Sequence, residues 1–214
     1  MTLPIVLASN NAKKLKELSA LLAELPVSLV SQGSLGIPEA EEPHATFVEN
    51  ALAKARHASA ASGRAALADD SGLCVAALGG APGVISAHYA GLVPPEADRE
   101  ATRRRQDAAN NQRLLAELSE LAPQSERSGW FICTLVAVRH PQDPEPLVAV
   151  GRWPGHILPA PRGDGGFGYD PLMFIPALGH TVAELSAAQK NAVSHRAQAT
   201  AQLKALLRQT WFAR

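Results

Sequence analysis

Hydrophobic residues at the start of the chain predict a strand followed by a helix. Leu3 to Ala8 is a short apolar run, the pattern of a strand buried on both faces. The polar residues Ser9 to Asn11 follow it and favour a turn and a helix N-cap. Leucines then recur at helical spacing from Leu15 to Leu25 and stop before Pro26. The opening is therefore a strand, a polar turn and an amphipathic helix.

The next part of the chain predicts two helices with a strand between them. Thr46 and Glu49 form a capping box, and the alanine-rich stretch after them is helical as far as Gly63. Ala65–Ala68 predicts a strand that leads into a pair of aspartates. Ala97–Leu121 predicts one long helix.

The second half predicts an antiparallel hairpin, a short strand and a C-terminal helical region. Trp130–Val138 and Leu147–Trp153 are rich in β-branched and aromatic residues and are joined by a His-Pro-Gln-Asp-Pro turn. Met173–Ile175 is a short strand. Thr181–Glu184 is a second capping box, and helical sequence continues from it towards Leu207.

These elements predict an α/β protein with a mixed β-sheet flanked by helices. Strands and helices interleave, but the hairpin excludes a purely parallel sheet. We find no linker and no internal repeat, so residues 1–214 are expected to form a single domain. The loop from Gly155 to Asp170 is rich in glycine and proline, and a long loop in a compact domain is usually functional.

Composition and charge favour a globular protein with a large core and argue against nucleic-acid and membrane partners. The chain is 46% hydrophobic and carries 20 basic and 20 acidic residues, which favours a large core and argues against a nucleic-acid partner. The run Arg103–Arg105 is typical of a solvated helix face. Cys74 and Cys133 lie far apart in apolar runs, as buried thiols of a reducing compartment do. With neither a signal peptide nor an apolar stretch of about 20 residues, we expect a cytoplasmic protein that makes no membrane contact.

The turn Ser9–Lys14 is a candidate phosphate site. A strand that runs through a polar turn into a helix presents backbone N–H groups at the helix N-terminus, where anions bind. The hydroxyl, amide and ammonium groups of Ser9, Asn11 and Lys14 add donors. An ordinary N-cap with exposed lysines is the alternative, because the glycines of a Walker A loop are absent.

The acidic residues are candidates for metal binding and base catalysis. Asp69 and Asp70 are consecutive at a strand end, so they point to opposite sides and are expected to differ in role. Like charges so close raise one pKa, which suits a general base, although a solvated turn is the alternative. Glu41 and Glu42 offer a further carboxylate for Mg²⁺, or they only complement a helix dipole together with Glu49.

The glycine-rich segment Gly165–Asp170 is a candidate base-binding loop. Phe167 stands among three glycines, where its ring could stack on a base, while Asp170 could accept hydrogen bonds from ring N–H groups. A turn with Phe167 tucked into the core is the alternative.

A second group of polar residues near the C-terminus could meet phosphate or a base carbonyl. Lys190 and Ser194 are four residues apart and would share one face of a helix. Arg196 adds a further cation, and His195 is either a ligand-binding or an ordinary histidine.

The order and spacing of these motifs resemble the Ham1/inosine triphosphate pyrophosphatase family over about residues 5–207. The matching segments are SNNAKKLKEL, TFVENALAKA, LADDSGLCVAALGGAPGVISAHYAG, GGFGYDPLMF and NAVSHRAQA. The resemblance implies a mixed-sheet fold with two lobes around a central cleft, dependence on Mg²⁺, a homodimer, and hydrolysis of non-standard purine nucleoside triphosphates (ITP, dITP, XTP) to the monophosphate and pyrophosphate. His88 and Ala197 depart from residues common in the family.

The resemblance also implies roles for individual residues. Asp70 matches the general base, and Glu41 and Asp70 match the metal contacts, with Glu42 as the alternative register for Glu41. The implied substrate contacts are Ser9, Asn10, Asn11, Ala12, Lys13, Lys14, Ser71, Phe167, Gly168, Tyr169, Asp170, Lys190, His195 and Arg196.

The expected reaction is attack of water, activated by Asp70, on the α-phosphorus. Donors on Lys190, His195 or Arg196 would favour a base with a carbonyl oxygen at its six position over adenine. The alternatives are a Maf-like pyrophosphatase with another base preference and a sensor that binds nucleotide without hydrolysis.

Overall fold

The computed structural model describes residues 2–121 and 126–213, which form two compact units. Unit 1 contains Met1–Asp70, Cys133–Arg152 and Val193–Arg214, and unit 2 contains Ser71–Ile132 and Trp153–Ala192. The strands are β1 (Leu3–Leu7), β2 (Val27–Ser31), β3 (Ala66–Val75), β4 (Ser128–Val138), β5 (Leu147–Ile157), β6 (Met173–Ile175) and β7 (His180–Thr181). The α-helices are α1 (Ala12–Leu21), α2 (Phe47–Ser62), α3 (Arg99–Leu121), α4 (Ala187–Val193) and α5 (His195–Thr210).

The predicted mixed sheet is confirmed. Within the described residues the strand order is β2-β1-β3-β4-β5-β6-β7. β1 pairs in parallel with β2 and β3, whereas β6 pairs antiparallel with β5 and β7. The two strands of the predicted hairpin, β4 and β5, are neighbours in this order.

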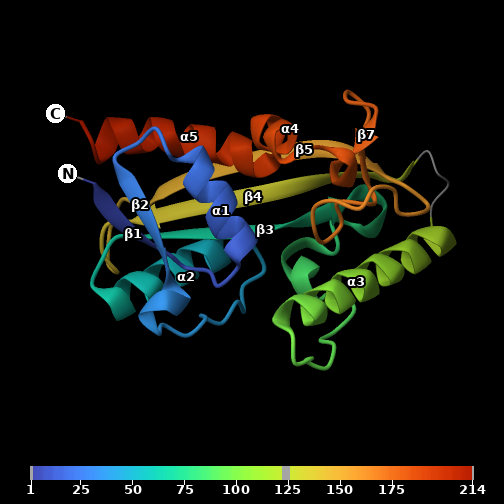
Figure 1. Ribbon diagram of the computed structural model, residues 1–214, viewed down its shortest axis with the longest axis horizontal. Coiled ribbons are helices and arrows are strands. Elements are labelled where there is room, and N and C mark those ends of the chain that lie inside the picture. The colour runs from blue at the N-terminus through green and yellow to red at the C-terminus, as the bar shows by residue number, and fades with distance from the viewer. Residues whose placement is uncertain (1, 122–125, 214) are drawn as a thin grey trace. The chain divides into compact units, whose positions relative to one another are not determined.

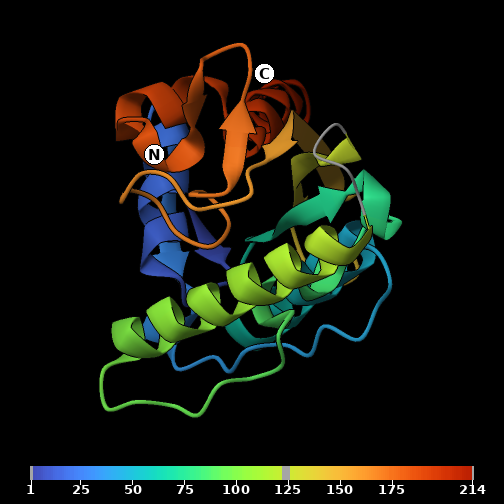
Figure 2. The same ribbon diagram turned by 90° about the vertical axis from the view of Figure 1, so that its right-hand side faces the viewer.

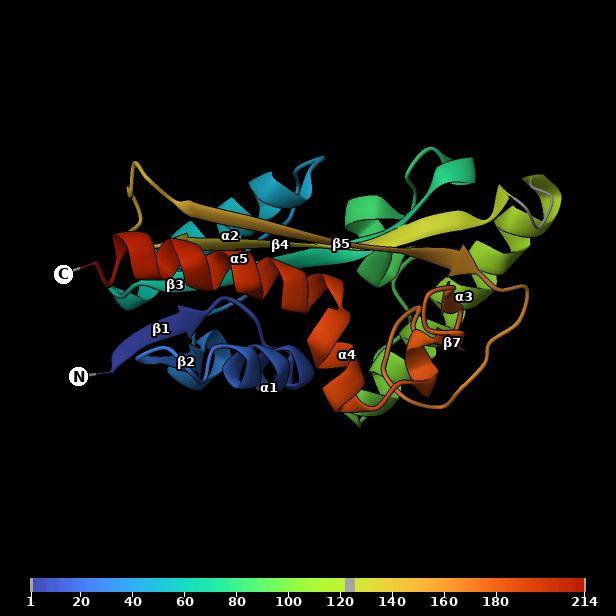
Figure 3. The same cartoon turned by 90° about the horizontal axis from the view of Figure 1, so that it is seen from above.

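Unit 1 has helices on both faces of its strands. Ile5 and Leu7 pack in one core cluster with leucines of α1 and α5, while Val6 and Ala8 pack in another with alanines of α2. Figure 1 accordingly shows α5 and α2 on opposite sides of β1 and β2. α1 contacts α5 (Figure 3). Burial on both faces explains why β1 is a continuous apolar run.

Sequence analysis did not identify β2. This strand has the sequence VSLVS, and most of its residues are only partly buried. β2 pairs with β1 and lies at the edge of the sheet, so its residues need not be continuously apolar. Its two serines therefore made the segment resemble a loop in the sequence.

The predicted end of β3 at Ala68 is wrong. The strand continues through Asp69 and Asp70 to Val75, and both aspartates are buried. Acidic residues are tolerated inside a buried strand when their charges are paired, and cations on neighbouring helices supply those pairs here.

The C-terminal helical region is divided. The second capping box is confirmed at Thr181 and Glu184, but it caps only a short 3₁₀ helix. α4 then ends at Val193, and Ser194 is the N-cap of α5, with an extended backbone and a side chain that accepts from the Ala197 N–H. The prediction that Lys190 and Ser194 share a helix face is therefore wrong.

Unit 2 has its own core, to which α3 contributes Leu114 and Leu118. α3 is one long helix, as predicted, although it begins at Arg99 (Figure 2). β5 extends beyond its predicted end at Trp153 to Ile157, so the loop that was predicted from Gly155 begins after this strand. Gly155 permits this extension, because a Cβ there would lie 2.5 Å from the Phe174 carbonyl oxygen on β6.

None of the helices in the described part of the chain has the length and apolarity to cross a membrane.

Candidate active site

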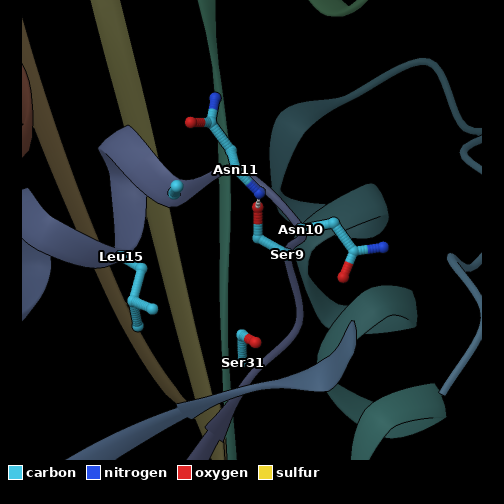
Figure 4. Close-up of a pocket in the computed structure, with 6 residues that line it drawn as sticks. Ser9, Asn10, Asn11, Leu15 and Ser31 are labelled. Carbon is cyan, nitrogen blue, oxygen red and sulfur yellow. Dashed lines mark hydrogen bonds between the residues drawn. The ribbon is translucent and has the colours of Figure 1, made fainter. Parts of the chain in front are cut away.

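The turn Ser9–Lys14 is ordered by its own side chains. Asn11 caps α1, and its Oδ1 accepts from the N–H groups of Lys13 and Lys14 at 3.0 and 3.2 Å. Ser9 Oγ accepts from the Asn11 N–H at 3.1 Å (Figure 4). A pocket of about 90 Å³ is lined by Ser9, Asn10, Asn11, Ala12, Leu15 and Ser31. The turn thus places a small pocket, lined in part by polar side chains, at a helix N-terminus, where anions bind.

Asp69 lies at the centre of a buried charge cluster in unit 1. Its Oδ1 is 2.6 Å from Lys14 Nζ, and its Oδ2 is 2.7 Å from Arg196 Nε. Arg196 also binds Glu17 at 2.6 Å. Burial alone would raise the pKa of Asp69, but the charges of Arg196 and Lys14 outweigh it and hold that pKa well below 3.8. Asp69 therefore stays ionised and fixes one cation from α1 and another from α5.

Asp70 points to the opposite face and joins a second cluster, as the strand geometry predicts. Lys54 Nζ on α2 lies 2.8 Å from Asp70 Oδ1 and 3.1 Å from Glu42 Oε2. Asp70 Oδ2 is buried and has no hydrogen-bond partner among residues 2–121 and 126–213. The carboxylate thus has one oxygen held by protein and one left for a ligand.

Burial raises the pKa of Asp70 to about 6, against the opposing charge of Lys54. Burial would likewise lower the pKa of Lys54, but Asp70 and Glu42 outweigh it and raise that pKa. Burial tends to raise the pKa of Glu42 as well, but the charge of Lys54 lowers it overall. The cluster therefore holds an ionised Glu42 and Lys54 beside a carboxyl that titrates close to neutral pH.

Glu42, and not Glu41, is the glutamate of this cluster. Asn50, fully buried on α2, accepts from the His44 N–H at 3.0 Å and donates to the His44 carbonyl at 3.1 Å. These two hydrogen bonds fix the segment before α2, in which Glu42 lies within hydrogen-bond distance of Lys54. Both Glu41 and Glu42 are exposed. The structure therefore assigns the ion pair with Lys54 to Glu42, while the metal contact implied for Glu41 stays a prediction.

Glu42 and Asp70 fit a divalent cation. Across the described residues, no three His, Cys, Asp or Glu side chains gather as a ready-made metal site. Mg²⁺ usually takes only one or two carboxylates and completes its coordination with water and substrate phosphates. The buried Oδ2 of Asp70, which accepts no hydrogen bond from the part of the chain that the structure describes, is suited to such a hard cation.

Lys54 is the residue that sequence reasoning missed. It lies on the buried stripe of α2 together with Ala51, Ala55 and Ala58. A lysine at a helical position otherwise occupied by small apolar residues must find an internal partner. The helical spacing of Lys54 with Ala51, Ala55 and Ala58 was the sequence signal that could have identified it as a buried lysine.

The loop Gly165–Asp170 in unit 2 folds around the Asp170 carboxylate. Asp170 Oδ2 accepts from the Phe167 N–H at 3.0 Å and from Lys190 Nζ at 2.8 Å. Lys190 Nζ also lies 4.6 Å from the centre of the Phe167 ring. At Gly166, where φ is +74°, a Cβ would lie 2.1 Å from Asp170 Oδ2, so only glycine fits this turn. The structure thus brings Phe167, Asp170 and Lys190 together.

The remaining predicted substrate contacts lie outside the two charge clusters and the loop hydrogen bonds described above, except for Arg196. The Tyr169 ring is buried in the core of unit 2, and its hydroxyl donates to the Ser86 carbonyl at 2.9 Å. His195 and Arg196 begin α5 in unit 1, and Arg196 is 2% exposed. Ser71 lies on β3, and the Lys13 side chain is exposed. Gly151 lets α5 approach β5, because a Cβ there would lie 1.9 Å from the His195 carbonyl oxygen.

A mixed α/β fold with a polar turn at a helix N-terminus and buried carboxyls beside it is typical of proteins that bind phosphorylated ligands. The model of the Ham1 family matches residues 5–206, and the chain belongs to this family. It is 66% identical over 209 residues to the dITP/XTP pyrophosphatase of Methylibium petroleiphilum, covering 98% of this chain and 99% of that protein. It is 62% identical over 204 residues to the protein of the same name from Ralstonia nicotianae, covering 95% and 96%. The structure of a HAM1 protein from Coxiella burnetii matches with a TM-score of 0.87 and 44% identity, covering 98% of this chain and all of that one.

Proposed function

We propose that the chain, as one domain over residues 1–214, hydrolyses non-standard purine nucleoside triphosphates such as dITP, XTP and ITP to the monophosphate and pyrophosphate. The names of its relatives support this reaction and this substrate class. The observation that carries the chemistry is Asp70, a buried carboxyl with a pKa of about 6 and one oxygen that has no hydrogen-bond partner among the described residues. A pKa in that range suits a general base at neutral pH.

Asp70 accepts the proton of the water that attacks the α-phosphorus, and the bond to pyrophosphate breaks. Lys54 holds Asp70 Oδ1, so that Oδ2 faces the ligand. Asp70 together with Glu41, or with Glu42 in the alternative register, would hold Mg²⁺, which when bound would stabilise the negative charge of the triphosphate and of the leaving pyrophosphate. Ham1 family pyrophosphatases are generally metal-dependent, which supports this assignment.

The turn Ser9–Lys14 binds phosphate oxygens through backbone N–H groups at the N-terminus of α1. Lys14 is already held by Asp69, so its ammonium group is fixed in place before substrate binds. This arrangement lowers the entropy that the side chain loses on binding.

The loop Gly165–Asp170 binds the base. Phe167 offers a ring for stacking, and Lys190 offers a donor for a carbonyl oxygen at the six position. His195 keeps the donor role that the family resemblance implies. Arg196 is buried against Asp69 and Glu17, so we assign it to holding Asp69 as well as to the substrate contact that the resemblance implies. Adenine presents an amino group at the six position, which would leave those donors without an acceptor.

The protein is expected to be a cytoplasmic homodimer with a nucleotide substrate and no nucleic-acid or membrane partner. The family match favours this reading over a Maf-like enzyme. The intact pair Asp69 and Asp70 argues against a sensor that only binds nucleotide.

The test is pyrophosphate release from dITP, XTP, ITP, dGTP, dATP and the pyrimidine triphosphates, with Mg²⁺ and with EDTA. We expect release from the first three, abolished by EDTA and restored by Mg²⁺. A discrimination of at least about 100-fold against dATP is expected if unpaired buried donors reject adenine. Equal turnover of dATP and dITP would contradict the six-oxo argument, and nucleotide binding without release would favour the sensor.

The pH dependence of the reaction should reflect the pKa of Asp70. Because only the ionised form accepts a proton, kcat/KM for dITP at low Mg²⁺ should fall as the pH drops below about 6. Lys54 favours the ionised form, so Lys54→Met should move this limb to higher pH. Lys16→Met, which removes an exposed lysine of α1, is the control and should leave the limb in place. If the pH at which kcat/KM falls were unchanged or lower in Lys54→Met, Lys54 would not be setting the pKa of Asp70.

A further inference from the structure

One residue of the base-binding loop, Gly168, is held at both of its backbone polar groups by α3. Asp107 Oδ2 accepts from the Gly168 N–H at 2.8 Å. Asn111 Nδ2 donates to the Gly168 carbonyl at 3.0 Å. Asp107 and Asn111 are four residues apart and therefore project from the same face of the helix. A single rigid element thus fixes the peptide groups before and after Gly168.

The loop needs such an external support because of its own composition. Gly166 and Gly168 flank Phe167, and both have left-handed backbone conformations, with φ of +74° and +61°. Glycine loses more conformational freedom on ordering than any other residue, so this stretch does not hold a single shape without further contacts. The loop's own bonds run from the Phe167 N–H to the Asp170 carboxylate and from the Asp170 N–H to the Phe167 carbonyl, and neither of these bonds engages the polar groups of Gly168.

We infer that Asp107 and Asn111 are positioning residues that fix the base-binding loop and hence the ring of Phe167. This inference rests on the proposed function, since it takes the purine base as the ligand of the loop. Neither residue is required to touch the base; each acts through the Gly168 backbone. Sequence analysis gave no role to α3, because the partner of a backbone group cannot be read from a pattern of side chains.

The neighbouring Asn110 has a different task. It accepts from the Ala90 N–H at 2.9 Å and donates to the carbonyls of Ser86 and Ala87 at 3.2 and 3.1 Å. Ser86 in turn accepts the hydroxyl of Tyr169. Asn110 therefore supports the fold beneath the loop, and its substitution would not separate positioning from stability.

The first measurement is hydrogen exchange of the full chain without ligand. The variants are Asp107→Ala and Asn111→Ala, and the matched controls on the same helix are Glu120→Gln and Gln112→Ala, both at exposed positions. We expect faster exchange in peptides spanning Gly165–Asp170 in the first pair only, with thermal melting confirming that each variant is folded. Asp107→Asn keeps an amide oxygen that can accept from Gly168, so it should restore much of the protection. Unchanged exchange in both alanine variants would overturn the inference.

The second measurement is the kinetics of pyrophosphate release from dITP and dATP. The alanine variants should raise KM for dITP about tenfold, the effect of losing roughly 1.4 kcal/mol of positioning, with kcat changed much less. The preference for dITP over dATP should fall, which a merely structural role would not produce. Faster exchange with unchanged KM and preference would overturn the base-positioning role. If the unsubstituted chain released no pyrophosphate, the proposed function would fail, while the exchange data would still show whether α3 holds the loop.

Discussion

Asp70→Asn should lower the turnover of dITP by about 10²–10⁴-fold, the contribution expected of a positioned general base. Asparagine has nearly the same shape, but its amide oxygen does not take up a proton from water. The substitution also removes one of the two carboxylates that we assign to Mg²⁺. Substrate binding through the turn Ser9–Lys14 and the loop Gly165–Asp170 should persist, so kcat should fall far more than KM rises.

The stability of Asp70→Asn should not fall. The pKa of Asp70 in the folded protein is about 6, above its ordinary 3.8, so ionised Asp70 destabilises the fold at neutral pH. That cost is present above pH 6 and disappears as the pH falls towards 4. Asparagine removes the cost, and Lys54 retains Glu42 as its ion-pair partner. Turnover by pyrophosphate release and thermal melting at pH 7.5 are the two readouts, with Glu120→Gln as control. Turnover within about threefold of the unsubstituted chain would exclude Asp70 as the base.

Arg196→Met should destabilise the protein by about 3–5 kcal/mol, because it leaves a buried carboxylate without its main partner. The Arg196 side chain is 2% exposed, and that of Asp69 is fully buried. Lys14 alone would then balance Asp69, while Glu17 would lose its arginine. The pKa of Asp69 lies well below 3.8 in the folded state, so its stabilising contribution is complete above about pH 4 and is lost at lower pH.

Urea unfolding at pH 7.5 measures this loss. Arg208→Met is the matched control on the same helix: it breaks an exposed pair with Glu24 and should leave stability unchanged. The double variant Asp69→Asn with Arg196→Met should be more stable than Arg196→Met alone, since it no longer buries an unbalanced charge. A loss below about 1 kcal/mol in Arg196→Met would show that Lys14 suffices to balance Asp69.

Much of the fold could be predicted because the local patterns were strong. The continuous apolar run of β1, the capping box at Thr46 and the long periodic helix α3 all appear in the structure near their predicted positions. Each depends on burial or capping within a few residues, so it leaves a local signal. β2 was missed because it is stabilised by pairing with β1. The break between α4 and α5 was missed because it depends on a single side-chain cap, that of Ser194.

The candidate site was predictable in its residue types and less so in its partners. Strand alternation correctly gave Asp69 and Asp70 opposite sides and different surroundings. It could not say that Lys14 and Arg196 would meet Asp69, or that Lys54 would meet Asp70. Those contacts join residues 16 to 127 positions apart in the chain. The approach of Glu42 to Lys54 likewise depends on the two hydrogen bonds between Asn50 and His44.

The sequence by itself determined the α/β class, the polar turn at the start of α1, the acidic pair and the glycine-rich loop, because each is written in local composition and period. Only the tertiary structure decided which cations meet each aspartate: Lys14 and Arg196 hold both oxygens of Asp69, whereas Lys54 holds one oxygen of Asp70. The physical reason is that ionisation and hydrogen bonding depend on burial and on the charges within a few ångströms. For Asp69 and Asp70 those charges come from helices distant in sequence, which pack on opposite faces of one strand.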